Sequence, residues 1–171
     1  SLVKVPVSVS QEGYRIDPAT GECSIIIEET PKYKMTSYAS TRAKEGETQI
    51  GDSYSFNKNI DGTYLTIISD GMGSGPEASS ESKLAVDLIE KFMESGFNYK
   101  TAIDTVNSIM AMKFNEDEKF TTMDLNLIDL YTGESEFIKI GGVVSFIKRG
   151  AKIFAIKSNS LPFGILESLE I

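Results

Sequence analysis

The chain has 171 residues, an ordinary length for one domain, with 25 acidic and 17 basic residues, a net charge of −8 and no histidine. This charge argues against a nucleic-acid-binding domain, and the lack of histidine excludes Ser-His-Asp and Cys-His catalysis within the chain. Cys23 is the sole cysteine, which excludes an internal disulfide, and no apolar run reaches the roughly 18 residues that span a membrane.

The first 70 residues have the alternation and composition of strands joined by turns. The Asp61-Gly62 pair is typical of a hairpin turn, and the apolar segment before Asp70 predicts a central strand. The predicted strands cover 1–16, 24–27, 33–41, 53–57 and 63–69.

Glycines at 71, 73 and 75 then end the strand pattern, and apolar residues recur at helical spacing. Pro76 suits the first turn of a helix over 76–95 and Gly96 suits its end, and a second helix is predicted over 98–114. The apolar stripes are Leu84, Ala85, Leu88, Ile89, Phe92 and Met93 in the first helix, and Ala102, Val106, Ile109 and Met110 in the second.

Short strands follow the helices, with turn residues between them. Because consecutive strands flank a pair of consecutive helices, the order predicts an α+β fold with antiparallel sheets. These later strands are predicted at 123–131, 136–140, 143–148 and 152–157, with 166–171 as the start of another.

Three aspartates occupy unusual places in this pattern. Asp52 precedes a strand, Asp70 ends the most apolar strand, and Asp124 lies inside one. A charge in such a strand is costly to bury, and a bound cation is one way to offset that cost. Because the chain has no histidine, any metal would be bound by carboxylates, carbonyls and water, which favours Mg²⁺ or Mn²⁺.

Each of these features also has a simpler interpretation. An aspartate before a glycine is most often a turn residue, which is our interpretation of Asp61. The glycines of DGMGSG at 70–75 could merely begin the following helix. The string fits neither a P-loop nor a dinucleotide-binding fingerprint.

Several longer segments resemble the phosphatase domain of the stage II sporulation protein E family, a branch of the PP2C-type (PPM) serine/threonine phosphatases. They match in order and spacing over nearly the whole chain. The segments are GDSYSF at 51–56, LTIISDGMGSGPEASSES at 65–82, FTTMDLNLIDLYTGESEFIKIG at 120–141 and SFIKRGAKIFAIKSNSLPFGIL at 145–166.

The resemblance implies an αββα sandwich of two antiparallel sheets flanked by helices, with residues 1–171 as a single domain. It implies two Mn²⁺ or Mg²⁺ ions at one edge of the sandwich. It further implies hydrolysis of a phosphoserine on an anti-anti-sigma factor, which controls a sporulation sigma factor. The resemblance implies a cytoplasmic domain of a membrane-anchored protein whose anchor lies outside this chain. It leaves open whether the domain forms a homodimer.

The resemblance also implies roles for particular residues. Asp70 matches the aspartate that bridges both metals, and Gly71 matches the glycine that offers its backbone carbonyl. Asp52 matches an aspartate beside the second metal, and Asp124 matches one on the first. The two helices are similar to the family's switch helices, which couple activation to the metal site.

The chain departs from the wider PP2C pattern at two points. Met72 stands where many of these enzymes have a histidine proposed as a general acid, which leaves the acid for the leaving group unassigned. The family pattern continues beyond Ile171 to one more metal-binding aspartate. We therefore expect a domain that is incomplete at its C-terminal end, with weak activity and partial metal occupancy.

Two other function classes fit the same residues. One is a regulatory or partner-binding module that uses the phosphatase fold without catalysis. The other is an assembly scaffold that exposes a sheet edge. Substitution of Asp70 would abolish the function of an enzyme and spare that of a binding module.

Overall fold

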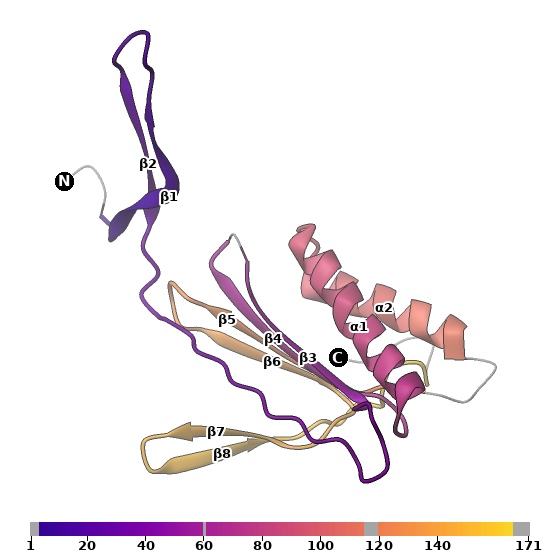
Figure 1. Ribbon diagram of the computed structural model, residues 1–171. Coiled ribbons are helices and arrows are strands. Elements are labelled where there is room, and N and C mark those ends of the chain that lie inside the picture. The colour runs from indigo at the N-terminus through magenta and orange to yellow at the C-terminus, as the bar shows by residue number, and fades with distance from the viewer. Residues whose placement is uncertain (1–3, 60, 115–119, 166–171) are drawn as a thin grey trace.

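The structure is a computed structural model that describes residues 4–59, 61–114 and 120–165. Its strands and helices follow the predicted order (Figure 1). The elements are β1 (Val7–Ile16), β2 (Cys23–Glu29), β3 (Asp52–Lys58), β4 (Thr63–Asp70), α1 (Pro76–Glu94), α2 (Tyr99–Phe114), β5 (Met123–Asp129), β6 (Ser135–Ile140), β7 (Ser145–Arg149) and β8 (Lys152–Ile156).

The central feature is a four-stranded antiparallel sheet in the order β3-β4-β5-β6. Both helices lie on one of its faces (Figure 1). Turns joining β3 to β4 and β5 to β6 let neighbours in the sequence pair directly, whereas β4 and β5 pair across the two intervening helices. The α+β class predicted from the sequence is therefore confirmed.

The side chains of the central strands point alternately to a face of the sheet that the helices cover and to an open face. In β4, Leu65 and Ile67 are buried under the helices, whereas Ile68 between Ile67 and Ser69 is exposed on the other side. The buried core joins one face of the sheet to both helices and to Phe163, which reaches it from the segment after β8. Its members are Leu65, Ile67, Ala85, Val86, Ile89, Ala102, Ile103, Val106, Met110, Met123, Leu125, Ile138, Ile140 and Phe163.

The ends of the helices have local causes. Pro76 occupies the first turn of α1, and Gly96, with φ of 84°, follows its end and donates its backbone N–H to the Met93 carbonyl at 3.0 Å. Asn98 caps α2, because its side-chain oxygen accepts a hydrogen bond from the Thr101 backbone N–H at 2.9 Å. Among the described residues, no helix is long and apolar enough to cross a membrane.

Helix α1 meets the edge strand β3 through polar side chains. The Ser53 and Ser82 hydroxyls lie 2.8 Å apart, and Asn57 donates to Glu94 at 3.0 Å. Ser55 donates to Glu90 between these two contacts. The helix therefore packs on β4 through apolar residues and on β3 through hydrogen bonds.

Two sequence predictions were wrong in detail. Residues 33–41 form no strand, because this extended segment has no ladder partner in the part of the chain that the structure describes; Tyr33 donates one backbone hydrogen bond to the Leu130 carbonyl at 2.9 Å. In α2, Ile109 is exposed and Ile103 is buried instead, because the core face of the helix runs through Ala102, Ile103, Val106 and Met110. The predicted strand at 166–171 lies outside the described residues.

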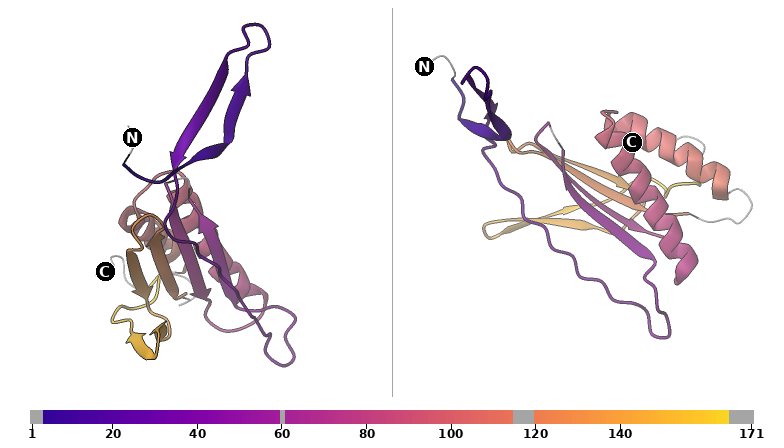
Figure 2. Two further views of the ribbon diagram at one scale, coloured as in Figure 1. Left: turned by 90° about the vertical axis from the view of Figure 1, so that its left-hand side faces the viewer. Right: turned by 45° about the horizontal axis from the view of Figure 1, so that its top comes forward.

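Two hairpins extend from this body. The β1–β2 hairpin stands away from the sheet and helices, and the connection from β2 to β3 runs as a long extended segment (Figure 2). Both faces of this hairpin are exposed, including Val9, Tyr14 and Ile27. The β7–β8 hairpin forms a separate pair, and it begins at Ser145 beside the open face of the sheet.

Candidate metal and phosphate site

The strand register places the three predicted aspartates on the open face of the sheet, toward one end. Asp52 and Asp70 are direct partners across β3 and β4. Asp124 on β5 is the partner of Ile68, two residues before Asp70 on the same face. Asp52 and Asp70 are therefore adjacent, whereas Asp124 is displaced along the neighbouring strand. Within the part of the chain that the structure describes, they do not form one cluster of three carboxylates.

The Asp52–Asp70 pair is electrostatically unfavourable as it stands. Loss of surrounding water raises the pKa of Asp70, and the hydrogen bond and the negative charge of Asp52 raise that pKa further. Like charges directly opposite each other on neighbouring strands destabilise a sheet. A cation between the two carboxylates would offset this repulsion.

Glycine is needed at position 71, beside this pair, because the backbone there lies too close to α1 for a side chain. A Cβ atom at Gly71 would lie 2.3 Å from the Ala78 carbonyl oxygen, inside the first turns of α1. The following Gly73 has φ of 92°, in the region that favours glycine. The turn after Asp70 can therefore lie directly against the start of α1, and its glycines are structural whether or not the Gly71 carbonyl also binds a metal.

A buried hydroxyl pair connects Asp70 to the segment before β5. The Ser69 and Thr121 hydroxyls are 2.9 Å apart and both side chains are fully buried. Ser69 donates to the Thr122 carbonyl at 2.8 Å, and Thr121 donates to the Asp70 carbonyl at 2.8 Å. These bonds fix the end of β4, and with it Asp70, relative to the strand that bears Asp124.

Asp124 has one partnered and one unpartnered oxygen. Its Oδ2 accepts from the Lys139 ammonium group and from the Ser145 hydroxyl, the latter at 3.2 Å. Its Oδ1 is buried and has no hydrogen-bond partner among the described residues. Gly142 lies beside that oxygen, because a Cβ there would be 2.9 Å from it. A buried carboxylate oxygen without a partner is costly, and a metal ion would satisfy it.

These residues fit a hard divalent cation by the chemistry of their donors. Asp52 and Asp70 offer paired carboxylates, Gly71 a backbone carbonyl, and Asp124 a buried oxygen without a partner among the described residues. Oxygen donors of this kind suit Mg²⁺ and Mn²⁺. The sequence reasoning identified these four residues but missed Lys139 and Ser145. The cross-strand register pairs Lys139 with Asp124, and Ser145 is located beside both residues by its hydrogen bonds.

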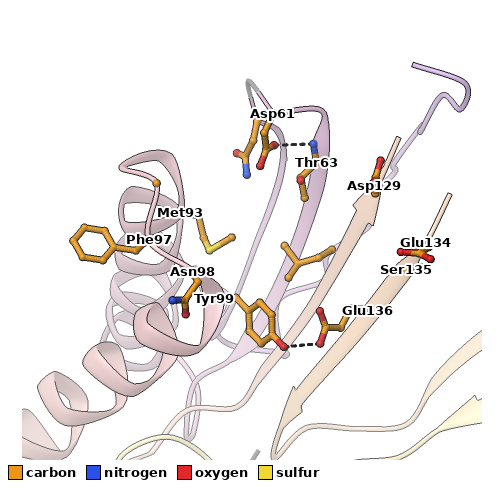
Figure 3. A pocket seen from close by; sticks show the side chains of 13 residues that line it. Asp61, Thr63, Met93, Phe97, Asn98, Tyr99, Asp129, Glu134, Ser135 and Glu136 are labelled. Carbon is orange, nitrogen blue, oxygen red and sulfur yellow. Dashed lines mark hydrogen bonds between the residues drawn. The ribbon is translucent and has the colours of Figure 1, made fainter. Parts of the chain in front are cut away.

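A separate pocket lies at the opposite end of the sheet, on its helix-covered side (Figure 3). It has a volume of about 750 Å³ between the end of α1, the start of α2 and the ends of β4 to β6. Two of its carboxylates already accept hydrogen bonds within the fold: Asp61 from the Thr63 backbone, and Glu136 from the Tyr99 hydroxyl at 2.6 Å. The aspartate end of the sheet, and not this pocket, has the set of donors that metal chemistry requires.

Comparison with known proteins identifies the family. Residues 60–171 match the model of the stage II sporulation protein E (SpoIIE) family. Stage II sporulation protein E of Bacillus subtilis is 38% identical over 170 residues, which are 99% of this chain and 20% of that protein. The protein of the same name from Priestia megaterium is 39% identical over 151 residues, which are 88% of this chain and 26% of that protein. The chain thus spans about a fifth to a quarter of the length of these relatives.

Solved structures agree on the fold. The PP2C phosphatase domain and a fragment of the regulatory domain of SpoIIE from Bacillus subtilis match with a TM-score of 0.80 and 35% identity. That match covers 99% of this chain and 50% of the solved chain. RsbX in complex with magnesium matches with a TM-score of 0.61 and 21% identity over 75% of this chain and 62% of that chain, a likeness of fold alone. The chain therefore has the PP2C-type fold that its sequence implied.

Proposed function

The chain belongs to the stage II sporulation protein E family of PP2C-type phosphatases, and from this premise we propose that it is a metal-dependent protein serine phosphatase. The observation that carries the proposal is the Asp52–Asp70 pair. Two carboxylates are direct register partners on the open face, at the end of the sheet where the glycine turn begins. Such a pair adds no stability to a sheet when both groups are ionised, since like charges directly opposite each other repel.

Each acidic residue has a distinct part in this proposal. Asp52 and Asp70 would hold Mn²⁺ or Mg²⁺ between β3 and β4, with the Gly71 carbonyl as a further oxygen donor. Asp124 would contribute its Oδ1 from β5 to the first of two ions, Asp52 would serve the second, and Asp70 would serve both. When bound, such ions lower the pKa of water and neutralise charge on a phosphoryl group. Neither role requires histidine, which the chain lacks.

The proposed substrate is a phosphoserine on an anti-anti-sigma factor, whose dephosphorylation controls a sporulation sigma factor. Membership of the SpoIIE family supports this assignment. The same membership supports a cytoplasmic place for the domain in a membrane-anchored protein. It also supports α1 and α2 as switch helices; the polar contacts of α1 with β3 suit a helix that shifts, because hydrogen bonds can be exchanged with water.

The test is Mn²⁺-dependent phosphate release from a phosphoserine-bearing anti-anti-sigma protein. It compares the 171-residue chain with one extended through the next Asp-Gly of the family pattern. We expect Mn²⁺-dependent release of phosphate. The decisive variant is Asp70→Asn in the longer chain, which should abolish release.

Asp61→Asn is the matched control, since Asp61 also precedes a glycine but accepts a bond from its own turn at Thr63. It should leave release unchanged. The rival function is a partner-binding module on the same fold. Absence of release in both chain lengths, together with partner binding that survives Asp70→Asn, would favour that module and reject the phosphatase.

A further inference from the structure

Lys139 is a buried lysine whose charge is directed at a candidate metal ligand. It is the cross-strand partner of Asp124 on β6, and its side chain is 4% exposed. Its ammonium group donates to Asp124 Oδ2 and to the Ser145 hydroxyl, the latter at 2.8 Å. Burying an ammonium group is costly unless it is paired and hydrogen-bonded. The buried ammonium group of Lys139 is therefore stabilised specifically by its pairing with Asp124.

Ser145 completes a three-membered network with these two residues. Its hydroxyl lies 3.2 Å from Asp124 Oδ2 and 2.8 Å from the Lys139 nitrogen. Because β7 begins at Ser145, the network also connects the β7–β8 hairpin to the open face of the sheet. Both residues contact the same oxygen of Asp124, Oδ2, and the other oxygen, Oδ1, has no partner among the described residues.

We propose that Lys139 and Ser145 are positioning residues that anchor Asp124 Oδ2 and so present Oδ1 to a divalent cation. This inference rests on the proposed function, because it concerns the same metal site. Partners that hydrogen-bond a ligating carboxylate fix its orientation, and their loss typically lowers metal affinity by about 10–100-fold. Lys139 also offsets part of the negative charge that three aspartates concentrate at this end of the sheet.

The alternative to positioning is that Lys139 competes with the metal ion, so that the ammonium group and the ion exclude each other from Asp124. The two roles differ in sign. If Lys139 positions the carboxylate, its removal weakens metal binding. If Lys139 competes, its removal strengthens metal binding. The geometry favours positioning, because the contacts of Lys139 use Oδ2 and leave Oδ1 available.

The experiment measures Mn²⁺ affinity from the loss of the free-ion electron paramagnetic resonance signal, in both chain lengths described above. Lys139→Met should raise the dissociation constant by about 10–100-fold, and Ser145→Ala by about tenfold. Ser145→Thr retains the hydroxyl and should stay near the unsubstituted chain. Lys148→Met, which removes an exposed lysine from β7, is the matched control and should leave the dissociation constant unchanged.

Thermal unfolding in EDTA, recorded for every variant, separates positioning from simple stabilisation. A lower melting temperature with unchanged Mn²⁺ affinity for both Lys139→Met and Ser145→Ala would overturn the inference, as would tighter binding. If Lys139→Met does not fold, Ser145→Ala alone decides, because it leaves the ion pair in place. Failure of the unsubstituted chains to bind Mn²⁺ would instead overturn the proposed function, and this inference with it.

Discussion

Asp52 and Asp70 lie directly opposite each other on neighbouring antiparallel strands, on the face of the sheet that the helices leave open. Loss of solvation and the Asp52 carboxyl group together raise the pKa of Asp70. A fold that retains such a pair loses some stability, and this loss indicates a function that needs two adjacent carboxylates. This relationship underlies the first prediction.

Asp70→Asn should abolish phosphate release without lowering the stability of the metal-free chain. The substitution removes a carboxylate from the proposed metal site and also removes its repulsion with Asp52. We expect a loss of activity of at least about 100-fold, as for an interaction worth a few kcal/mol in the transition state. Thermal unfolding in EDTA checks the second part; a clearly lower melting temperature would show that Asp70 has a structural role instead.

Gly71→Ala should destabilise the fold by about 1–3 kcal/mol, the usual cost of overpacking. The added methyl group would lie 2.3 Å from the Ala78 carbonyl oxygen, which belongs to the backbone of α1 and cannot turn aside. Gly73→Ala is the comparison, because no atom lies within 4 Å of its Cβ position and only its φ of 92° opposes the change. That variant should lose about 1 kcal/mol. Equal losses in urea unfolding would contradict the steric argument.

The helices and central strands were predictable because their signals are local. Pro76 and Gly96 mark the two ends of α1 in the sequence, and the apolar composition of 63–69 predicts a central strand. The aspartates of the candidate site can be singled out for the same reason, since a charge stands out against an apolar strand. Their assembly into a metal centre stays a prediction.

Features that depend on register and on distant segments were not predictable. Lys139 is the partner of Asp124 only because β5 and β6 pair in one register, and a shift by one residue would direct it to the other face. Phe163 fills the core from a segment that shows no periodicity. Residues 33–41 have a strand-like composition, but composition cannot show whether a partner strand is present.

Thr121→Val should destabilise the chain by about 0.5–1.5 kcal/mol, the net contribution of one hydrogen bond, although valine has nearly the same shape. The change removes the hydroxyl that donates to the Asp70 carbonyl and that lies 2.9 Å from the buried Ser69 hydroxyl. Thr121→Ser retains the hydroxyl and should lose less. If unfolding in urea shows the valine variant to be as stable as the original, the hydroxyl pair contributes no net stability and does not fix the end of β4.

The turn between β5 and β6 should make stability depend on pH through Asp129. Its Oδ1 accepts the backbone N–H groups of Tyr131 at 2.7 Å and Thr132 at 3.1 Å. The hydrogen bond from Thr132, followed by that from Tyr131, lowers the pKa of Asp129 below its ordinary value of 3.8. Because these bonds favour the ionised form, protonation must weaken them.

The direction of the effect follows from linkage. A carboxyl group whose pKa is lower in the folded chain contributes stability above its unfolded pKa, and loses that contribution as the pH falls through the folded value. The melting temperature of the original chain should therefore exceed that of Asp129→Asn at neutral pH. The difference should shrink below about pH 4, because asparagine retains the acceptor oxygen but does not ionise. A difference that stays constant from about pH 7 to 3 would show that the charge of Asp129 does not stabilise the turn.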